Sequence, residues 1–235
     1  MAGRVAYYGN IVKDGLVLDL DAAKRDSYPG NGTAWNDIAG GVITGSLING
    51  PTFDSGNGGS IVFDGVDDYI NCGSNNIINT GNSFTVGFWI NMTSMPSTVT
   101  SPIIIKSNAD DLLILISSRT SYEGISIGSG TTWAQGRTNT TSSFFLQQWV
   151  HVAVTYNGSG ANNLSNFNIY ENSINKTITS GTAGLLSQST STIIGYINSG
   201  NTLNGKISNF SIYNRALNAT EVRQNYNALR GRYGI

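Results

Sequence analysis

Short segments in which apolar and polar residues alternate recur along most of this chain. A spacing of two residues places successive side chains on opposite faces of an extended strand. The clearest segment runs from Trp149 to Tyr156, where Val150, Val152 and Val154 share one face. About a dozen such segments, most of them bounded by Gly, Pro, Asn or Asp, predict a protein built of short strands.

An acidic corner joins two of these segments within Ser60–Cys72. In the first segment, Ile61 and Phe63 share one face. Asp64-Gly65 then gives a strong turn signal, because Gly adopts positive φ easily and Asp can accept a hydrogen bond from its own backbone. The corner extends as far as Asp68, too long for a two-residue hairpin. We therefore expect a wider loop or a bulged turn.

One helix is expected, over residues 219–230. Asn218 can cap the free amides of its first turn, and Glu221 can reach back to complete a capping box. Val222, Tyr226 and Leu229 then form one apolar stripe. This stripe must be buried on a sheet.

Composition narrows the partners and the cellular setting. The formal net charge is −1 and only 11% of the residues are charged, so the chain offers no basic surface for nucleic acid. No apolar run reaches the roughly 18 to 20 residues that cross a bilayer, and Met1–Asn10 lacks the apolar core of a signal peptide. We expect a protein made in the cytoplasm, with no membrane partner. Cys72 is the only cysteine, which excludes an internal disulfide and a cysteine metal site.

These patterns predict an all-β fold, a two-sheet antiparallel jelly-roll sandwich with one short C-terminal helix. We expect one domain over residues 15–235, which includes the helix, preceded by an N-terminal arm over residues 1–14. The apolar residues of the arm fall outside the strand pattern, and we predict that they bind a partner protein: Tyr7, Tyr8, Ile11 and Val12.

The acidic corner raises the question of a metal. Asp64, Asp67 and Asp68 are hard oxygen ligands, and Asp19, Asp21 and Asp37 could converge on them in a sandwich: this makes calcium an alternative. No known ion-loop spacing is present, however. We interpret these acids as turn caps and a solvated loop rim, assign no metal ligand and expect no cofactor.

Catalytic residues are sparse. His151 is the only histidine and lies inside a strand pattern, and no nucleophile elbow accompanies it. Glutamate occurs only at Glu123, Glu171 and Glu221, the last in the helix cap. We assign no catalytic residue and predict that the protein is not an enzyme, with a glycan hydrolase as a remote alternative.

Aromatic rings among Asn and Thr residues suit glycan recognition. Trp133 lies in a glycine-rich stretch, and Tyr122 lies nearby in the sequence. We name these two as candidate glycan-binding residues. Trp35 is better explained by packing.

Taken together, the segments resemble the concanavalin A-like jelly rolls of laminin G-like or pentraxin-like type. The resemblance covers most of the chain from Gly15 to Tyr226. It is carried by Gly15–Asp21, Ser60–Ile70, Phe84–Ile90, Gln148–Tyr156 and Gly205–Leu217.

A narrower resemblance concerns the segments Asp26–Gly30, Thr33–Asp37 and Gln224–Gly234. They are similar to stand-alone proteins of tailed bacteriophages, marine ones especially, that are described as virion structural proteins. This resemblance implies a surface or decoration component of the capsid or tail. Such a protein would act through contacts with other virion proteins, as a homo-oligomer on the particle. The alternative is a lectin-like adhesin that binds host surface glycans.

Overall fold

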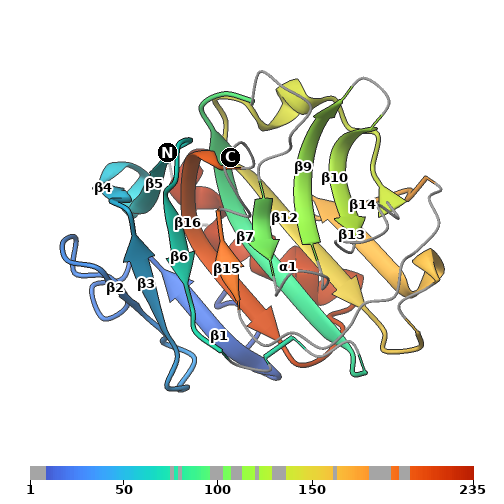
Figure 1. The fold of residues 1–235 in the computed structure, drawn as a ribbon. Helices are drawn as coiled ribbons and strands as arrows, with labels where there is room; N and C mark the ends of the chain where they lie inside the picture. Colours follow the sequence, from blue (N-terminus) through green and yellow to red (C-terminus); the bar gives the residue numbers. More distant parts are fainter. Residues whose placement is uncertain are drawn as a thin grey trace, which may run out of the picture.

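The computed structural model describes residues 9–74, 77–78, 81–95, 103–106, 113–119, 122–128, 136–160, 163–179, 192–195 and 202–235. Within them the chain forms two antiparallel sheets and one α-helix (Figure 1). The predicted fold class is confirmed: the protein is mostly β, with two sheets arranged as in a concanavalin A-like jelly-roll sandwich and one short C-terminal helix.

The first sheet has the order β14-β13-β12-β7-β16-β5-β4, and β1 also pairs with β16. Its strands are β1 (Leu16–Asp21), β4 (Thr52–Asp54), β5 (Ser60–Asp64), β7 (Phe84–Met92), β12 (Val150–Tyr156), β13 (Phe167–Glu171), β14 (Ile174–Lys176) and β16 (Asn204–Tyr213).

The second sheet has the order β11-β10-β9-β8-β15-β6-β3-β2. Its strands are β2 (Ala34–Asn36), β3 (Thr44–Ile48), β6 (Tyr69–Asn71), β8 (Ile103–Lys106), β9 (Leu113–Arg119), β10 (Tyr122–Gly128), β11 (Gly136–Arg137) and β15 (Ile193–Ile194). Short 3-10 turns are η1 (Gly56–Gly58), η2 (Ser142–Phe145), η3 (Leu164–Asn166) and η4 (Gly231–Tyr233).

The main core lies between the two sheets. The alternation predicted for β12 is confirmed, since Val150, Val152 and Val154 are all fully buried in this core. Ile61 and Phe63 of β5 join them from the same sheet. Across the core, the second sheet contributes the side chains of Leu47, Ile70, Ile114, Ile116, Ile125 and Ile194.

The helix α1 (Ala219–Arg230) begins and ends where the sequence predicts, and the capping box between Asn218 and Glu221 is present. It is seen behind the strands in Figure 1. Val222 packs in one cluster with Ala153 of β12 and Tyr213 of β16, on the face of the first sheet that the main core does not use. The stripe is therefore buried on a sheet, as predicted.

The acidic corner does not form a hairpin. β5 pairs with β4 and β16 in the first sheet, whereas β6 pairs with β3 and β15 in the second. The corner is thus the wider of the two expected forms, a loop that carries the chain from one sheet to the other. Two hydrogen bonds hold it: Val66 N donates to Asp64 Oδ1 over 2.7 Å, and Asp64 N donates to Asp68 Oδ2 over 2.9 Å.

The N-terminal segment that the structure describes packs on its own chain. Val12 N donates to Asn225 Oδ1 of α1 over 2.8 Å, and Tyr213 Oη donates to Val12 O over 3.1 Å. Ile11 and Val12 are buried, so both side chains make their contacts within the chain. Tyr7 and Tyr8 lie outside the described residues, and a role of the arm in partner binding stays a prediction.

In the part of the chain that the structure describes, none of the helices combines the length and the apolar character that a membrane crossing demands.

Candidate functional site

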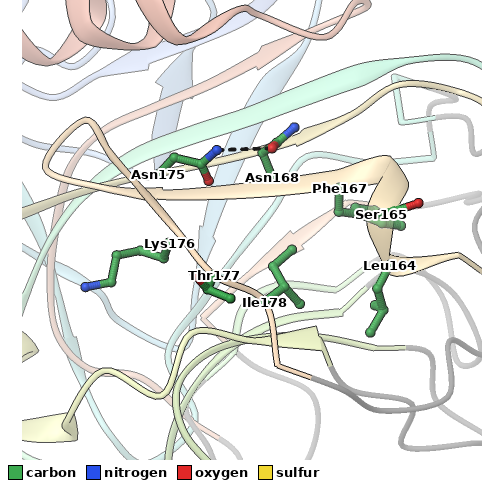
Figure 2. A pocket seen from close by; sticks show the side chains of 8 residues that line it. All are labelled: Leu164, Ser165, Phe167, Asn168, Asn175, Lys176, Thr177 and Ile178. Carbon is green, nitrogen blue, oxygen red and sulfur yellow. Dashed lines mark hydrogen bonds between the residues drawn. The ribbon is translucent and has the colours of Figure 1, made fainter.

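A hollow of about 490 Å³ lies at one edge of the first sheet, beside the hairpin of β13 and β14 (Figure 2). This volume falls in the range that small-molecule sites occupy. We call it the edge hollow. The described residues that line it are Leu164, Ser165, Phe167, Asn168, Asn175, Lys176, Thr177 and Ile178.

Polar side chains dominate its exposed wall. Asn175 Nδ2 donates to Asn168 Oδ1 over 3.2 Å, and Asn168 Nδ2 donates to Thr155 Oγ1 over 3.4 Å. Figure 2 shows the oxygen of Asn175 turned away from Asn168, and within the described residues nothing donates to it. Ser165 and Thr177 are also exposed, and the Ser165 hydroxyl donates to Asn163 Oδ1 over 2.8 Å. Amides and hydroxyls both donate and accept, so this wall suits a ligand rich in hydroxyl groups.

The remaining wall is apolar. The Phe167 ring is buried and stacks on Tyr156, with the ring centroids 4.6 Å apart. Leu164 and Ile178 are half-buried and stand at the margin of the hollow. A few polar groups next to such an apolar surface are typical of binding sites for small organic ligands.

Local sequence explains why the hollow forms. Asn163 caps η3, because its side chain accepts a hydrogen bond from Ser165 N over 3.0 Å. η3 then leads directly into β13. The hairpin turn follows, and Asn172 and Ser173 there have φ of 49° and 66°, the left-handed conformation that a tight two-residue hairpin requires. β13 and β14 therefore pair as a hairpin.

The Glu171 carboxylate anchors this edge to the second sheet. It is buried and accepts hydrogen bonds from Thr138 Oγ1 over 2.7 Å and from Thr140 Oγ1 over 2.6 Å. Lys176 Nζ lies 3.4 Å from its Oε2. Thr179 N also donates to Arg137 O over 2.9 Å. These contacts hold β13 and the residues after β14 against β11 and the residues that follow it.

Neither of the two predicted glycan-binding side chains is tested here, because Trp133 and the side chain of Tyr122 lie outside the described residues. Tyr122 begins β10, which pairs with β11 at the same edge of the sandwich as the edge hollow. Sequence reasoning missed the lining residues of the edge hollow. A weak signal was available, because Asn recurs between Asn163 and Asn175.

Other candidate residues are placed elsewhere. His151 is buried beside Trp89, with ring centroids 5.2 Å apart, and burial lowers its pKa to about 3. Trp35 is fully buried in the core, in agreement with a packing role.

The convergence of six acids, which the calcium alternative considered, does not occur. Asp37 Oδ1 accepts from Asp19 N over 2.7 Å, and Asp21 is paired with Arg232. Among the described residues, the acids that gather are Asp64, Asp67 and Asp68 at the corner.

A comparison with family models matches residues 64–223 to the concanavalin A-like lectin/glucanases superfamily. A search of curated protein sequences found no match.

Several solved structures resemble the fold. Domain 4 of AbnA, a GH43 extracellular arabinanase from Geobacillus stearothermophilus solved in complex with arabinotriose, is 20% identical, with a TM-score of 0.67 over 90% of this chain and 98% of that domain. The binding domain of botulinum neurotoxin DC, in complex with rat synaptotagmin II, is 16% identical with a TM-score of 0.68, over 93% of this chain and 52% of that one. A Trypanosoma rangeli sialidase is 16% identical with a TM-score of 0.61, over 93% of this chain and 33% of that one.

One prediction is corrected by these findings. The sequence led us to predict that the protein is not an enzyme, yet the similar structures include a domain of a glycoside hydrolase and sialidases. Sparse histidine and glutamate are thus a poor reason for excluding an enzyme on this fold. The sialidase is about three times as long as the region that this chain matches, and at such identities the likeness establishes the fold alone.

The family match covers more than half of the chain and agrees with the two-sheet architecture. The protein therefore belongs to the concanavalin A-like lectin/glucanases superfamily.

Proposed function

We propose that the protein binds glycans, and that the edge hollow is the binding site. The observation that carries this proposal is the set of exposed amides and hydroxyls from Asn168, Asn175, Ser165 and Thr177, beside the apolar Leu164 and Ile178. A sugar ring presents hydroxyls at its rim and C–H groups on its faces, and the two kinds of wall complement these two surfaces. A similar structure solved in complex with arabinotriose supports glycan binding as the function.

A glycan array with the whole chain identifies the ligand class. The array is run with and without a chelator, so that a need for a metal ion is recorded separately. The best ligand is then titrated by isothermal calorimetry. We expect Asn175→Ala to weaken its binding about fivefold or more, because a site that pairs with a ligand hydroxyl loses about 1 to 3 kcal/mol when that partner is removed.

The matched control is Asn31→Ala. Asn31 is exposed and distant in sequence from the edge hollow, so this variant should bind as the parent does. Equal affinity of Asn175→Ala and the parent would place the ligand elsewhere. If the protein bound no glycan on the array, the proposal of glycan binding would be overturned as a whole. The same samples are analysed for shortened glycans, because cleavage would show that binding serves a reaction.

We further propose that the protein acts on the surface of a bacteriophage particle, on the capsid or the tail, as a homo-oligomer in contact with other virion proteins. The support is the resemblance of Asp26–Gly30, Thr33–Asp37 and Gln224–Gly234 to phage proteins. On such a particle, the edge hollow would serve attachment to host surface glycans.

Imaging of phage particles labelled through this protein tests its location on the particle.

Deletion of residues 1–8 tests whether the N-terminal arm docks the protein on the particle. This deletion retains the contacts of Ile11 and Val12 with the rest of the chain. We expect the truncated protein to fold and to be lost from particles. Normal incorporation would show that the arm does not dock the protein.

A further inference from the structure

Three carboxylates gather at the corner between β5 and β6. Asp64, Asp67 and Asp68 each place one carboxylate oxygen within 4.8 Å of the others. Two oxygens bound to one calcium ion at 2.3 to 2.6 Å can be at most about 5 Å apart. The spacing of the three groups thus fits a single ion.

A second observation is independent of this clustering. Asp68 is only 3% exposed, and its Oδ1 has no hydrogen-bond partner within the described residues. Its other oxygen, Oδ2, accepts from Asp64 N. A buried carboxylate oxygen without a donor is costly, because it has lost its water without a replacement.

The surrounding charges increase this cost. The carboxylates of Asp64 and Asp67 lie close to the buried Asp68, and like charges repel one another. In the described part of the chain, no Lys or Arg forms an ion pair with any of the three carboxylates. A positive charge at the corner would offset both the repulsion and the missing partner of Asp68.

The corner is also held in place before any ligand arrives. Asn49 Nδ2 donates to Asp67 O over 3.0 Å, and Thr202 Oγ1 donates to Gly65 O over 2.6 Å. A Cβ built on Gly50 would lie 3.9 Å from Asp68 Oδ1. The unpartnered oxygen therefore lies near the Asn49-Gly50 turn, which also contacts Asp67.

We propose that this corner binds one divalent cation, calcium, through the carboxylates of Asp64, Asp67 and Asp68. Carboxylate oxygens are the ligands that calcium prefers, and water can supply the remaining positions of its six to eight. Magnesium demands a stricter octahedral geometry and gives up its water reluctantly. With three side-chain ligands and two of them exposed, the affinity belongs to the weak class of about 10⁻⁴ to 10⁻³ M.

The test is calorimetric titration of the chelator-treated whole chain with calcium chloride, paired with thermal unfolding at increasing calcium concentration. We expect one site per chain and a melting temperature that rises with calcium, because a ligand of the folded state stabilises it. The double variant Asp64→Asn/Asp67→Asn should lose at least tenfold in affinity. Asn keeps a side-chain oxygen that can accept from Val66 N, so this variant should fold.

The control variant is Asp26→Asn, which removes an exposed acid remote from the corner and should bind calcium as the parent does. In the absence of calcium, the double variant should melt at the same or a higher temperature than the parent, since repulsion within the corner is relieved. No heat and no thermal shift at 10 mM calcium would overturn the proposal. Undiminished binding by the double variant would overturn it equally, because the ion would then lie elsewhere.

Discussion

The Arg232 guanidinium forms two parallel hydrogen bonds with the Asp21 carboxylate, Nη1 to Oδ1 over 2.7 Å and Nη2 to Oδ2 over 2.8 Å. Asp21 ends β1 and Arg232 lies in η4 after the helix. Arg232 O also accepts from Asn57 Nδ2, whose side chain in turn accepts from Trp149 Nε1. Arg232 therefore attaches the C-terminal turn to β1 through its side chain and to η1 through its backbone oxygen.

Removal of the guanidinium should destabilise the fold strongly. Asp21 is 1% exposed, and Arg232→Ala would leave its carboxylate with Lys24, 3.7 Å away, as its remaining ion-pair partner. Breaking one side of a buried pair typically costs about 3 to 5 kcal/mol, and Lys24 should hold the loss near the lower figure. Urea unfolding measures this loss of unfolding free energy.

The control variant is Arg223→Ala, which removes an exposed arginine of α1 and should change the free energy of unfolding little. Equal effects of the two variants would contradict a special role for the pair.

The N-terminal cap of α1 should make a smaller contribution to the free energy of unfolding. Asn218 accepts hydrogen bonds from Thr220 N and Glu221 N, over 2.9 and 3.1 Å. Asn218→Ala should therefore lower the free energy of unfolding by about 1 kcal/mol. Asn227→Ala is the matched control, because Ala in the middle of a helix is at least as favourable as Asn. A loss of stability in the control alone would show that packing, and not the cap, governs this helix.

Local patterns were enough to predict many elements of the fold. The helix was predicted to the residue because its cap, stripe and end depend on neighbours in the sequence. β12 was recognised because Val150, Val152, Val154 and Tyr156 recur at every second position and place large, mainly apolar side chains on one face.

Long-range pairing could not be predicted in the same way. Nothing within Ser60–Cys72 says that its two strands join different sheets, because that depends on where β16 and β3 lie. Likewise, Asp19 and Asp21 were interpreted as acids of turns or of a solvated loop rim. Both are buried, because Asn209 and Arg232, which follow β1 by about 190 residues or more, contact their carboxylates. The edge hollow was missed for another reason: its described lining residues all lie between Leu164 and Ile178, but strand alternation alone does not show that side chains of η3, β13 and β14 line one hollow.

The buried histidine should make stability depend on pH. Burial holds the pKa of His151 at about 3 in the folded protein, against 6.5 as its ordinary value. Below pH 6.5 the imidazole of His151 therefore binds a proton in the unfolded chain but stays neutral in the folded protein. The contribution of this residue to the free energy of unfolding is complete above pH 6.5 and is lost as the pH falls towards 3. The loss between pH 7 and pH 5 should be about 2 kcal/mol.

Urea unfolding at both pH values measures this contribution when His151→Leu is studied alongside the parent. The variant lacks the proton-binding ring, so its unfolding free energy should fall less between pH 7 and pH 5. The comparison also cancels the titration of carboxylates such as Asp19, whose pKa is raised mainly by burial. An identical pH dependence in both proteins would mean that His151 is not held neutral by the fold.

Gly59 immediately precedes β5, at the start of the stretch that leads to the acidic corner. Its φ is 139°, and a Cβ built on it would lie 2.3 Å from the carbonyl oxygen of Ala22. That oxygen belongs to the backbone and cannot turn aside, so Gly59→Ala must shift β5 or the residues after β1. We expect Gly59→Ala to lower the free energy of unfolding by more than about 2 kcal/mol, measured by urea unfolding.

Gly32→Ala separates conformational strain from crowding. Gly32 also has positive φ, 84°, but a Cβ there would meet nothing within 4 Å. It should cost only about 1 kcal/mol. If the two variants were equally stable, close packing at Gly59 would not be what fixes the position of β5.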